Sequence, residues 1–414
     1  MTFDSPPTTA YVWVWLPGAV EPAVAGILQV DDAITYFNYG ASYLRRPDAI
    51  PIYLPELPLE RGRIRPLDGL TVAGCIDDAS PDGWGQRVIL HWLLGHGHHA
   101  DVMGLDLLTL LLESGSDRIG ALDFQATPDV YEARQVSATL DEMLDAAQLL
   151  QNGEPLSPAL ELALLRGSSI GGARPKALLD AGDRRLIAKF SANADPYPVV
   201  LAEAAAMSLA HRVGLRVAPT EVTTSLGRDV LLVERFDRTA VQGERRMLVS
   251  ALTILGLGEL GFRYATYPDL ADKIRERFTE PDATLHELFS RITFNICVSN
   301  TDDHARNHSA FWDGSQLSLT PAYDICPQLR TGGEAVQAMA IDRQGAKFSS
   351  LLTCVNASSV YHLSKADARE IIDHQIDVIR AQWSDASDEA RLPREQQEQL
   401  WGRQILNPYA LQGY

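Results

Sequence analysis

The feature that most constrains the fold of this 414-residue chain is a change of apolar pattern near Asp237. Before it, short apolar runs separated by Gly, Pro and Asp predict strands; after it, longer repeats are typical of helices. Strands are predicted at residues 11–16, 26–30, 34–37, 177–179, 185–190, around Val222 and at 230–233. Helical spacing is predicted at 83–112 with an interruption at 95–99, and at 140–150, 199–213, 285–298 and 366–383. We therefore expect an α+β fold in which a β-rich part precedes a mainly helical lobe.

Length and composition narrow the class of protein. A chain this long exceeds what one core usually holds, so two or three substructures are expected. A boundary at residues 152–155 and the change of pattern at Asp237 divide the chain into residues 1–150, 151–237 and 238–414. The net charge of -18 argues against a protein that holds nucleic acid by its overall charge. No apolar run approaches the about 20 residues that cross a bilayer, and the N-terminus does not resemble a signal peptide. Four cysteines without a CxxC pair complete the expectation of a reduced, cytoplasmic protein without a membrane partner.

The strongest chemical signal lies at residues 300–309, Asn-Thr-Asp-Asp-His-Ala-Arg-Asn-His-Ser. Asp302 and Asn307 stand five positions apart, and Asp324 follows seventeen residues later. Kinases use this order: one carboxylate near the attacking hydroxyl, then an amide oxygen and a second carboxylate on the metal. The spacing alone is weak because it arises often by chance. The oxygen set of Asn307 and Asp324 favours Mg²⁺ over Zn²⁺, and His304 beside the acids is a phosphate-contact or a structural histidine.

Two upstream features strengthen that signal. Residues 167–176 form a Gly-rich turn whose N–H groups suit phosphate oxygens, although it lacks the Walker A order and is also compatible with a plain turn. Lys189 ends an apolar strand, where it either holds phosphates or faces water at a sheet edge. Glu203 lies fourteen residues later, as a partner of that lysine or as a solvated helix charge. Residues 232–238 end a strand where a hinge to the helical lobe is expected.

Together these segments resemble the HipA-type serine/threonine kinases, which are toxins of bacterial toxin–antitoxin modules. The resemblance covers most of the chain and implies a two-lobed, protein-kinase-like fold with an extra N-terminal β-rich subdomain. It is carried by five segments in family order: Ser-Pro-Asp-Gly-Trp-Gly at 80–85, Ser-Ile-Gly-Gly-Ala-Arg-Pro-Lys at 169–176, Glu-Arg-Phe-Asp-Arg at 234–238, residues 300–309, and Thr-Pro-Ala-Tyr-Asp at 320–324.

The resemblance also implies roles for individual residues. Asp302 is the expected catalytic base or aligning group, Asn307 and Asp324 are the Mg²⁺ ligands, and Lys189 binds the ATP phosphates. Further contacts to the nucleotide are implied for Ser169, Ile170, Gly171, Gly172, Ala173, Glu234, Phe236, Asp237 and His304. Ser169 is the implied autophosphorylation site, and Ser168 is the second choice. A phosphate there would compete with ATP for the loop N–H groups.

Partners follow from the same resemblance. The family's usual partner is a small helix-turn-helix antitoxin (HipB-like) that binds operator DNA, and its targets are aminoacyl-tRNA synthetases. The chain departs from the family pattern at residues 247–255, Met-Leu-Val-Ser-Ala-Leu-Thr-Ile-Leu, where relatives carry polar residues. A nucleotide contact in that segment is therefore in doubt. Two other functions stay open: a small-molecule or lipid kinase, and a catalytically idle corepressor. The presence of Lys189, Asp302, Asn307 and Asp324 argues against the idle protein.

Overall fold

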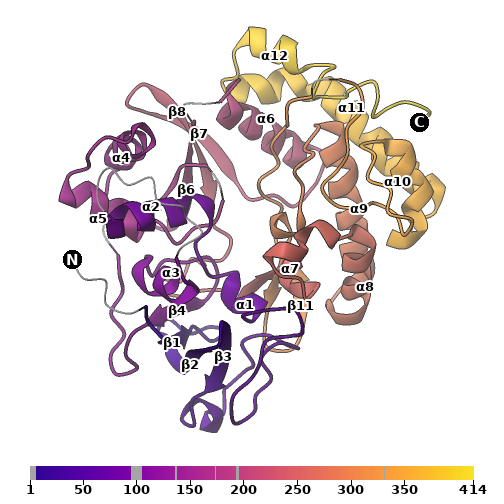
Figure 1. Ribbon diagram of the computed structural model, residues 1–414. Coiled ribbons are helices and arrows are strands. Elements are labelled where there is room, and N and C mark those ends of the chain that lie inside the picture. The colour runs from indigo at the N-terminus through magenta and orange to yellow at the C-terminus, as the bar shows by residue number, and fades with distance from the viewer. Residues whose placement is uncertain (1–5, 95–104, 136–137, 173, 193–194, 331) are drawn as a thin grey trace.

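The molecule has a β-rich part and a helical part that lie side by side (Figure 1). The computed structural model describes residues 6–94, 105–135, 138–172, 174–192, 195–330 and 332–414. In Figure 1 the indigo and magenta elements of the first half lie on one side and the orange and yellow helices on the other, except that α6 (Val199–Arg212) lies beside α11 (Lys365–Glu389). This arrangement confirms the expected α+β class and the order of its two parts.

The N-terminal part is built on an antiparallel sheet of four strands in the order β3-β2-β1-β4. Its strands are β1 (Thr9–Val14), β2 (Ala23–Asp31), β3 (Ile34–Tyr39) and β4 (Leu122–Gln125). The short η1 (Tyr43–Arg45) and α3 (Leu107–Glu113) contact this sheet, and α1 (Gly74–Asp77) contacts the helical lobe. The helices α2 (Gly83–Leu94), α4 (Leu140–Asn152) and α5 (Pro158–Arg166) lie beside the second sheet. Gly153 ends α4 with φ +71°, a conformation that glycine adopts without strain.

The second sheet carries Lys189 and Glu234, two of the residues predicted to contact the nucleotide. It is antiparallel in the order β5-β6-β8-β7, with β5 (Lys176–Ala181), β6 (Arg184–Phe190), β7 (Thr220–Ser225) and β8 (Arg228–Glu234). Helix α6 (Val199–Arg212) connects β6 to β7 and is buried along most of its length, as its run of alanines and leucines requires. The strand and helix predictions for this region are confirmed.

The remaining chain forms the helical lobe. Its helices are α7 (Ala251–Ile254), α8 (Tyr267–Arg277), α9 (Pro281–Cys297), α10 (Leu351–Ala357), α11 (Lys365–Glu389) and α12 (Arg394–Leu400), with the short η3 (Glu259–Tyr264), η4 (Ala305–Asn307) and η5 (Ser358–Tyr361). Twelve residues of α9 are buried, so this helix forms the centre of the lobe. Among the described residues, no helix is long and apolar enough to cross a membrane.

One element of this lobe was not expected from the sequence. Strands β9 (Leu248–Ser250), β10 (Ser309–Trp312) and β11 (Leu317–Leu319) form a small antiparallel sheet in the order β11-β10-β9. All four residues of β10 are buried, so its apolar and polar residues do not alternate as in a half-exposed strand. The sheet matters for function because β10 begins two residues after Asn307.

Packing does not separate at residue 150. A cluster of buried apolar residues joins α2, α4 and α5 to the face of the second sheet, through residues such as Trp84, Leu144, Leu164, Ala188 and Val230. A larger cluster runs from the first sheet into the helical lobe. The apolar packing thus crosses the first predicted boundary, at residue 150. The division of the chain into residues 1–150, 151–237 and 238–414 remains a prediction.

Candidate active site

The loop at residues 300–307 follows directly on the buried end of α9. Ser299, at the start of the turn, has φ +54°, and Asn300 is tied back to Asn295 by a backbone bond of 2.8 Å and a side-chain bond of 3.1 Å. Asp302 is then exposed, whereas Asn307 is buried and its side-chain nitrogen donates to the Asp302 carbonyl oxygen at 3.2 Å. This bond orients the amide, so that its oxygen is the end available to a metal.

A buried polar set holds the loop from behind. The carboxylate of Asp303 accepts from the Tyr267 hydroxyl and lies 3.0 Å from His308 Nε2. Burial would raise the pKa of Asp303, but His308 and Tyr267 hold it below its ordinary value. Asp303 and His308 are therefore structural groups, and Asp302 is the acid that faces outward.

Arg306 anchors the same loop to the N-terminal part. Its guanidinium lies 3.1 Å from Asp77 at the end of α1 and 2.7 Å from Glu259 at the start of η3. The Tyr323 hydroxyl also donates to the Arg306 carbonyl oxygen at 2.7 Å. Because Tyr323 precedes Asp324, these contacts fix the loop at residues 300–307, the predicted catalytic loop, relative to the second predicted metal ligand.

Asp324 and Lys189 meet at the centre of the site. Lys189 Nζ lies 2.5 Å from Asp324 and 2.5 Å from Glu203 on α6. The partner role considered for Glu203 is therefore the one that the structure supports. Asp324 has φ +59°, which is unusual for a residue other than glycine and occurs often at functional sites. Its side chain is 47% exposed, while that of Lys189 is 12% exposed.

The two outward carboxylates differ in their affinity for a proton. Lys189 holds the pKa of Asp324 well below its usual range, so this group stays ionised and suits a metal. Partial desolvation raises the pKa of Asp302, and Asp324 and Asp303 add to this, although His304 acts in the opposite direction. Environments that push two pKa values apart are typical of sites that divide metal binding from proton transfer.

The Gly-rich turn lies against the N-terminal part. The Asp82 carboxylate accepts from the Gly172 N–H, and Trp84 N–H donates to the Gly172 carbonyl oxygen at 3.0 Å. A Cβ on Gly85 would lie 2.1 Å from the Ser168 carbonyl oxygen, so this contact requires glycine. Asp82 thus already engages one of the N–H groups predicted to bind phosphate, and Ala173 lies outside the described residues.

Lys176 is a second cation that the sequence did not single out. It stands opposite Lys189 in the β5–β6 register, is buried, and donates to the Gly171 carbonyl oxygen. Burial lowers the pKa of Lys176, and neighbouring Lys189 adds to the effect. Lys176 begins β5 and Lys189 lies next to the end of β6, and only the antiparallel register of the hairpin places them together.

The serines of the turn are both buried. Ser168 donates its hydroxyl hydrogen to the Leu165 carbonyl oxygen at 2.6 Å. The Ser169 hydroxyl, in contrast, has no hydrogen-bond partner among the residues that the structure describes. Neither serine is positioned to accept a phosphoryl group without movement of the turn.

The predicted hinge follows β8. Glu234 donates its N–H to the Pro219 carbonyl oxygen at 2.8 Å, so its own carbonyl is the group left for an adenine edge. The Phe236 ring contacts Phe311 of β10 at 5.9 Å and Tyr323 at 5.6 Å between ring centroids. Phe236 therefore connects the hinge to the two loops that carry Asn307 and Asp324.

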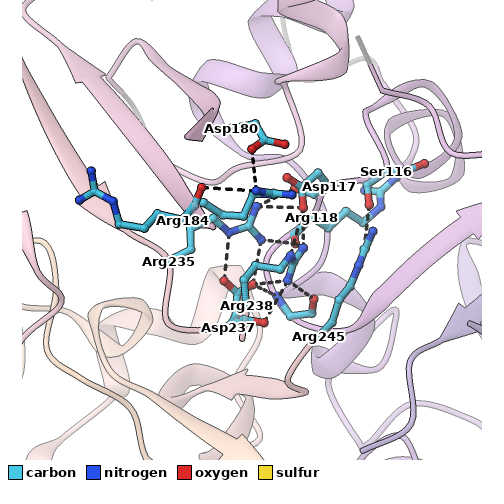
Figure 2. A network of polar contacts seen from close by, with 11 residues as sticks. Ser116, Asp117, Arg118, Asp180, Arg184, Arg235, Asp237, Arg238 and Arg245 are labelled. Carbon is cyan, nitrogen blue, oxygen red and sulfur yellow. Dashed lines mark hydrogen bonds and ion pairs between the residues drawn. The ribbon is translucent and has the colours of Figure 1, made fainter. Parts of the chain in front are cut away.

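Asp237 has a structural role in the hinge (Figure 2). Its buried carboxylate accepts from the Gly120 N–H at 2.7 Å and pairs with Arg235 at 2.8 Å and with Arg238 at 2.9 Å. The same two arginines pair with Asp117, at 3.1 and 2.6 Å. Both carboxylate oxygens of Asp237 are occupied by these contacts. The predicted contact of Asp237 with the nucleotide therefore remains a prediction only for its backbone groups.

The residues brought together suit a nucleotide and Mg²⁺. The described residues contain no cluster of three or more His, Cys, Asp or Glu side chains that would hold a metal by themselves. Asn307 and Asp324 offer two oxygen ligands, which is the partial set that proteins give to Mg²⁺ when substrate phosphates and water complete it. Lys189 and Lys176 supply positive charge for phosphates, and His304 lies close enough to Asp302 and Asp324 to lower the pKa of each.

Comparisons with known proteins agree with this geometry. Two family models match: the HipA-like C-terminal domain at residues 168–383 and the HipA N-terminal domain at residues 14–125. The chain is 28% identical over 315 residues to the putative kinase Y4mE of Sinorhizobium fredii, covering 70% of this chain and 71% of that protein. It is 30% identical over 164 residues to the serine/threonine-protein kinase toxin HipA of Shewanella oneidensis, covering 35% and 38%.

A solved structure has the same fold. It is the Shewanella oneidensis complex of HipA, HipB and operator DNA, with a TM-score of 0.65, 18% identity and coverage of 96% of this chain and 95% of that chain. This likeness confirms the kinase-like two-lobed fold. Because the C-terminal family model alone spans more than half of the sequence, the chain belongs to the HipA family of protein kinases.

Proposed function

We propose that this protein is an ATP- and Mg²⁺-dependent serine/threonine kinase that acts as the toxin of a toxin–antitoxin module. The observation that carries the proposal is the position of Lys189 between Glu203 and Asp324, 2.5 Å from each. Residues from a strand, a helix and a loop far apart in sequence meet there, close to Asp302. An idle binding protein would have no need to keep this arrangement.

The proposed roles follow from position and charge. When bound, ATP supplies the phosphoryl group and Mg²⁺ neutralises its charge. Lys189 and Lys176 bind phosphate oxygens, and Asn307 and Asp324 hold the metal. Asp302 aligns the acceptor hydroxyl and accepts its proton, for which its raised pKa is suited. The Glu234 carbonyl meets the adenine edge.

Autophosphorylation is proposed at Ser169, with Ser168 as the second choice. The Ser168 hydroxyl already donates to Leu165, whereas Ser169 keeps a buried hydroxyl without a partner in the described part of the chain. An unpaired buried hydroxyl costs free energy, which favours release of Ser169 when the turn opens. The added charge of about -1.5 to -2 would then prevent the turn from returning beside Asp82.

The partners are proposed from the structural likeness and from charge. The related HipA was solved with HipB and operator DNA, so we propose a HipB-like helix-turn-helix antitoxin as the partner. The net charge of -18 supports an indirect contact with DNA, through the antitoxin. An aminoacyl-tRNA synthetase is the proposed substrate and the cytoplasm the proposed location.

Incubation with labelled ATP and Mg²⁺ tests the kinase. We expect the wild type to label itself and Asp324→Asn to give no label, while both proteins show the same thermal unfolding temperature. Labelling of both proteins to the same extent would contradict the roles assigned to the site.

Two further assays separate the finer proposals. Ser169→Ala should remove most of the autophosphorylation detected by intact mass, and Ser168→Ala should retain it. Expression without an antitoxin should stop growth for the wild type but not for Asp324→Asn. Equal growth of the two strains would reject the toxin while leaving the kinase untouched.

A further inference from the structure

Exposed apolar side chains gather beside the catalytic loop. Five of the fourteen large apolar residues that are exposed in the described part of the chain lie in two short segments of the helical lobe. We call these five the apolar rim: Leu260, Phe262, Tyr264, Val336 and Phe348. Leu260 is 91% exposed and the others are exposed by half or more. Scattered exposed apolar residues are normal, but a contiguous group marks a binding surface.

The first segment of the apolar rim is η3. Glu259 begins η3 and pairs at 2.7 Å with Arg306, which lies between Asp302 and Asn307 in the chain. None of the η3 residues is buried, so their apolar side chains contribute little to the core. Arg263 lies over the Tyr264 ring, 4.9 Å from its centroid, and donates to its hydroxyl oxygen at 3.1 Å. These contacts orient the ring at the surface.

The second segment follows Asp324. Val336 and Phe348 face each other as a bridge pair between two antiparallel stretches, flanked by bonds from Gln337 N–H to Lys347 and from Ser349 N–H to Ala335. Side chains of such a pair lie next to each other on one face. Ala338 N–H donates to the Thr301 carbonyl oxygen at 3.1 Å, immediately before Asp302.

The two segments are joined to each other as well as to the loop. Thr266 and Ala340 form a parallel bridge, and Tyr267 N–H donates to the Ala340 carbonyl oxygen at 3.0 Å. Backbone contacts therefore link the two segments of the apolar rim to each other, and the segments are held to the loop at residues 300–307 by a hydrogen bond at Thr301 and an ion pair at Arg306.

We propose that the apolar rim binds an extended segment of the protein substrate, with apolar side chains flanking the acceptor serine or threonine. This inference rests on the proposed kinase function. An acceptor hydroxyl has to reach Asp302, and an extended chain advances only about 3.3 Å per residue, so its next few residues lie over the surface around the loop. Apolar side chains there gain free energy by covering apolar side chains of the rim.

The surface favours a protein over a small acceptor. A small polar molecule would use contacts within the site itself and would gain nothing from Leu260, Phe262 or Phe348. The extended geometry also fits the Val336–Phe348 pairing, whose two apolar side chains project from one face toward solvent. The proposed substrate is thus a polypeptide with apolar residues within a few positions of the hydroxyl.

A positional-scanning peptide library with a central serine or threonine tests the proposal on the full-length protein. We expect the wild type to select apolar residues at one or more flanking positions. Leu260→Ser/Phe262→Ser and Val336→Ser/Phe348→Ser should each lower kcat/KM for the selected peptide by about tenfold, since each variant removes two apolar side chains that the peptide would only partly cover. Val130→Ser, which removes an equally exposed apolar residue of the N-terminal part, should leave kcat/KM unchanged.

The outcomes separate this proposal from the kinase itself. Nucleotide binding, measured by calorimetry with ATP and Mg²⁺, should be the same for the wild type and both rim variants. Absence of nucleotide binding and of all labelling in the wild type would defeat the proposed function. If the wild type autophosphorylates but selects no apolar residues in the peptides, the proposed role of the apolar rim is rejected and the kinase is not. The same holds if both rim variants select the same peptides as the wild type. Dimerisation of the wild type that both rim variants abolish, seen by light scattering, would assign the surface to a second copy of the chain.

Discussion

The network around Asp237 and the cluster around Lys189 use the same kinds of charged side chains in opposite ways. In the first, the side chains of Arg235 and Asp237 are 0% and 2% exposed, and every carboxylate oxygen of Asp237 accepts from the protein. In the second, Lys189 is 12% exposed and Asp324 is 47% exposed. A group whose partners are all supplied by the protein stabilises the fold, whereas a group that still faces solvent can exchange its partner for a substrate.

Their positions in the fold explain this difference. The Asp237 network ties the end of β8 to residues 117–120 of the N-terminal part, a junction that has to keep its geometry (Figure 2). The Lys189 cluster lies between the sheet of β5 to β8 and the helical lobe, and Asp324 in this cluster has an unusual φ of +59°. Substitutions should therefore change stability at the first site and activity at the second.

The largest effect is expected for Asp302→Asn. The amide keeps the shape of the side chain but cannot accept a proton, so kcat should fall by about 10³- to 10⁴-fold. That corresponds to about 4 to 5 kcal/mol of activation free energy. Asp302 is exposed, so the free energy of unfolding should change by no more than about 0.5 kcal/mol. Single-turnover labelling and denaturant unfolding measure the two quantities. Asp183→Asn, in an exposed turn, is the matched control, and a loss of only a few-fold for Asp302→Asn would contradict its role.

Asp237→Asn should show the opposite pattern. It removes a charge that two buried arginines share, which should cost about 3 to 5 kcal/mol in the free energy of unfolding. The exposed pair of Arg185 with Asp180 provides the control, since Asp180→Asn should cost less than about 1 kcal/mol. Urea unfolding followed by fluorescence measures both variants. Equal losses of unfolding free energy in Asp237→Asn and Asp180→Asn would show that burial does not make the Asp237 pairs more stabilising than the exposed pair.

A third buried carboxylate sharpens the comparison through pH. Burial raises the pKa of Glu56 from 4.5 to about 7, although the N–H groups of Gly74 and Cys75 that donate to its carboxylate act in the opposite direction. Burial acts on Asp237 in the same direction, but Arg235 and Arg238 hold that pKa below its ordinary value. A raised carboxyl pKa contributes stability that is complete below pH 4.5 and is lost as the pH rises through 7.

Glu56→Gln cannot ionise and should escape this loss. The variant should gain about 2 to 3 kcal/mol relative to the wild type between pH 5 and pH 8. Unfolding curves at the two pH values measure the difference, in which the other titrating groups cancel. A difference that stays constant with pH would mean that Glu56 titrates normally.

The smallest effect is expected for Arg306→Met, at the contact between the two parts of the molecule. Loss of the pairs with Asp77 and Glu259 should loosen the catalytic loop and lower kcat by about tenfold, or about 1.4 kcal/mol, with KM for ATP unchanged. Arg306→Lys should restore part of kcat, because one ammonium can still pair with an acid. A change in KM alone would show that Arg306 serves binding and not the position of Asp302.

Much of the fold could be predicted because its elements are strongly patterned. The predicted helix at 199–213 is one residue longer than α6, the one at 285–298 ends one residue beyond α9, and the one at 366–383 lies within α11. The sheet of β9, β10 and β11 was missed since its strands are only three or four residues long and wholly or mostly buried. Short buried segments carry no period that distinguishes strand from helix.

The site could be predicted only as a set of residue types. Asp302, Asn307, Asp324 and Lys189 were expected from their order, and the structure brings Lys189 onto Asp324. The second lysine, Lys176, was not predicted as a site residue, because its position opposite Lys189 depends on the register of the hairpin. Asp82 contacts Gly172 of the Gly-rich turn, 90 residues away in the chain, and Asp77 contacts Arg306, 229 residues away. No local sequence pattern predicts contacts over such separations.

The sequence by itself determined the order of strands and helices, the presence of a kinase-like set of residues, and an acidic surface. These properties depend on residue type and spacing within short segments. The tertiary structure decided which charged groups receive all their partners from the protein and which stay exposed: it buried Asp237 among arginines, left Asp302 and Asp324 open to solvent, and exposed apolar side chains in two segments linked to the loop at residues 300–307. The physical reason is that burial and counter-charge depend on neighbours distant in sequence, and these set the pKa and the availability of each group.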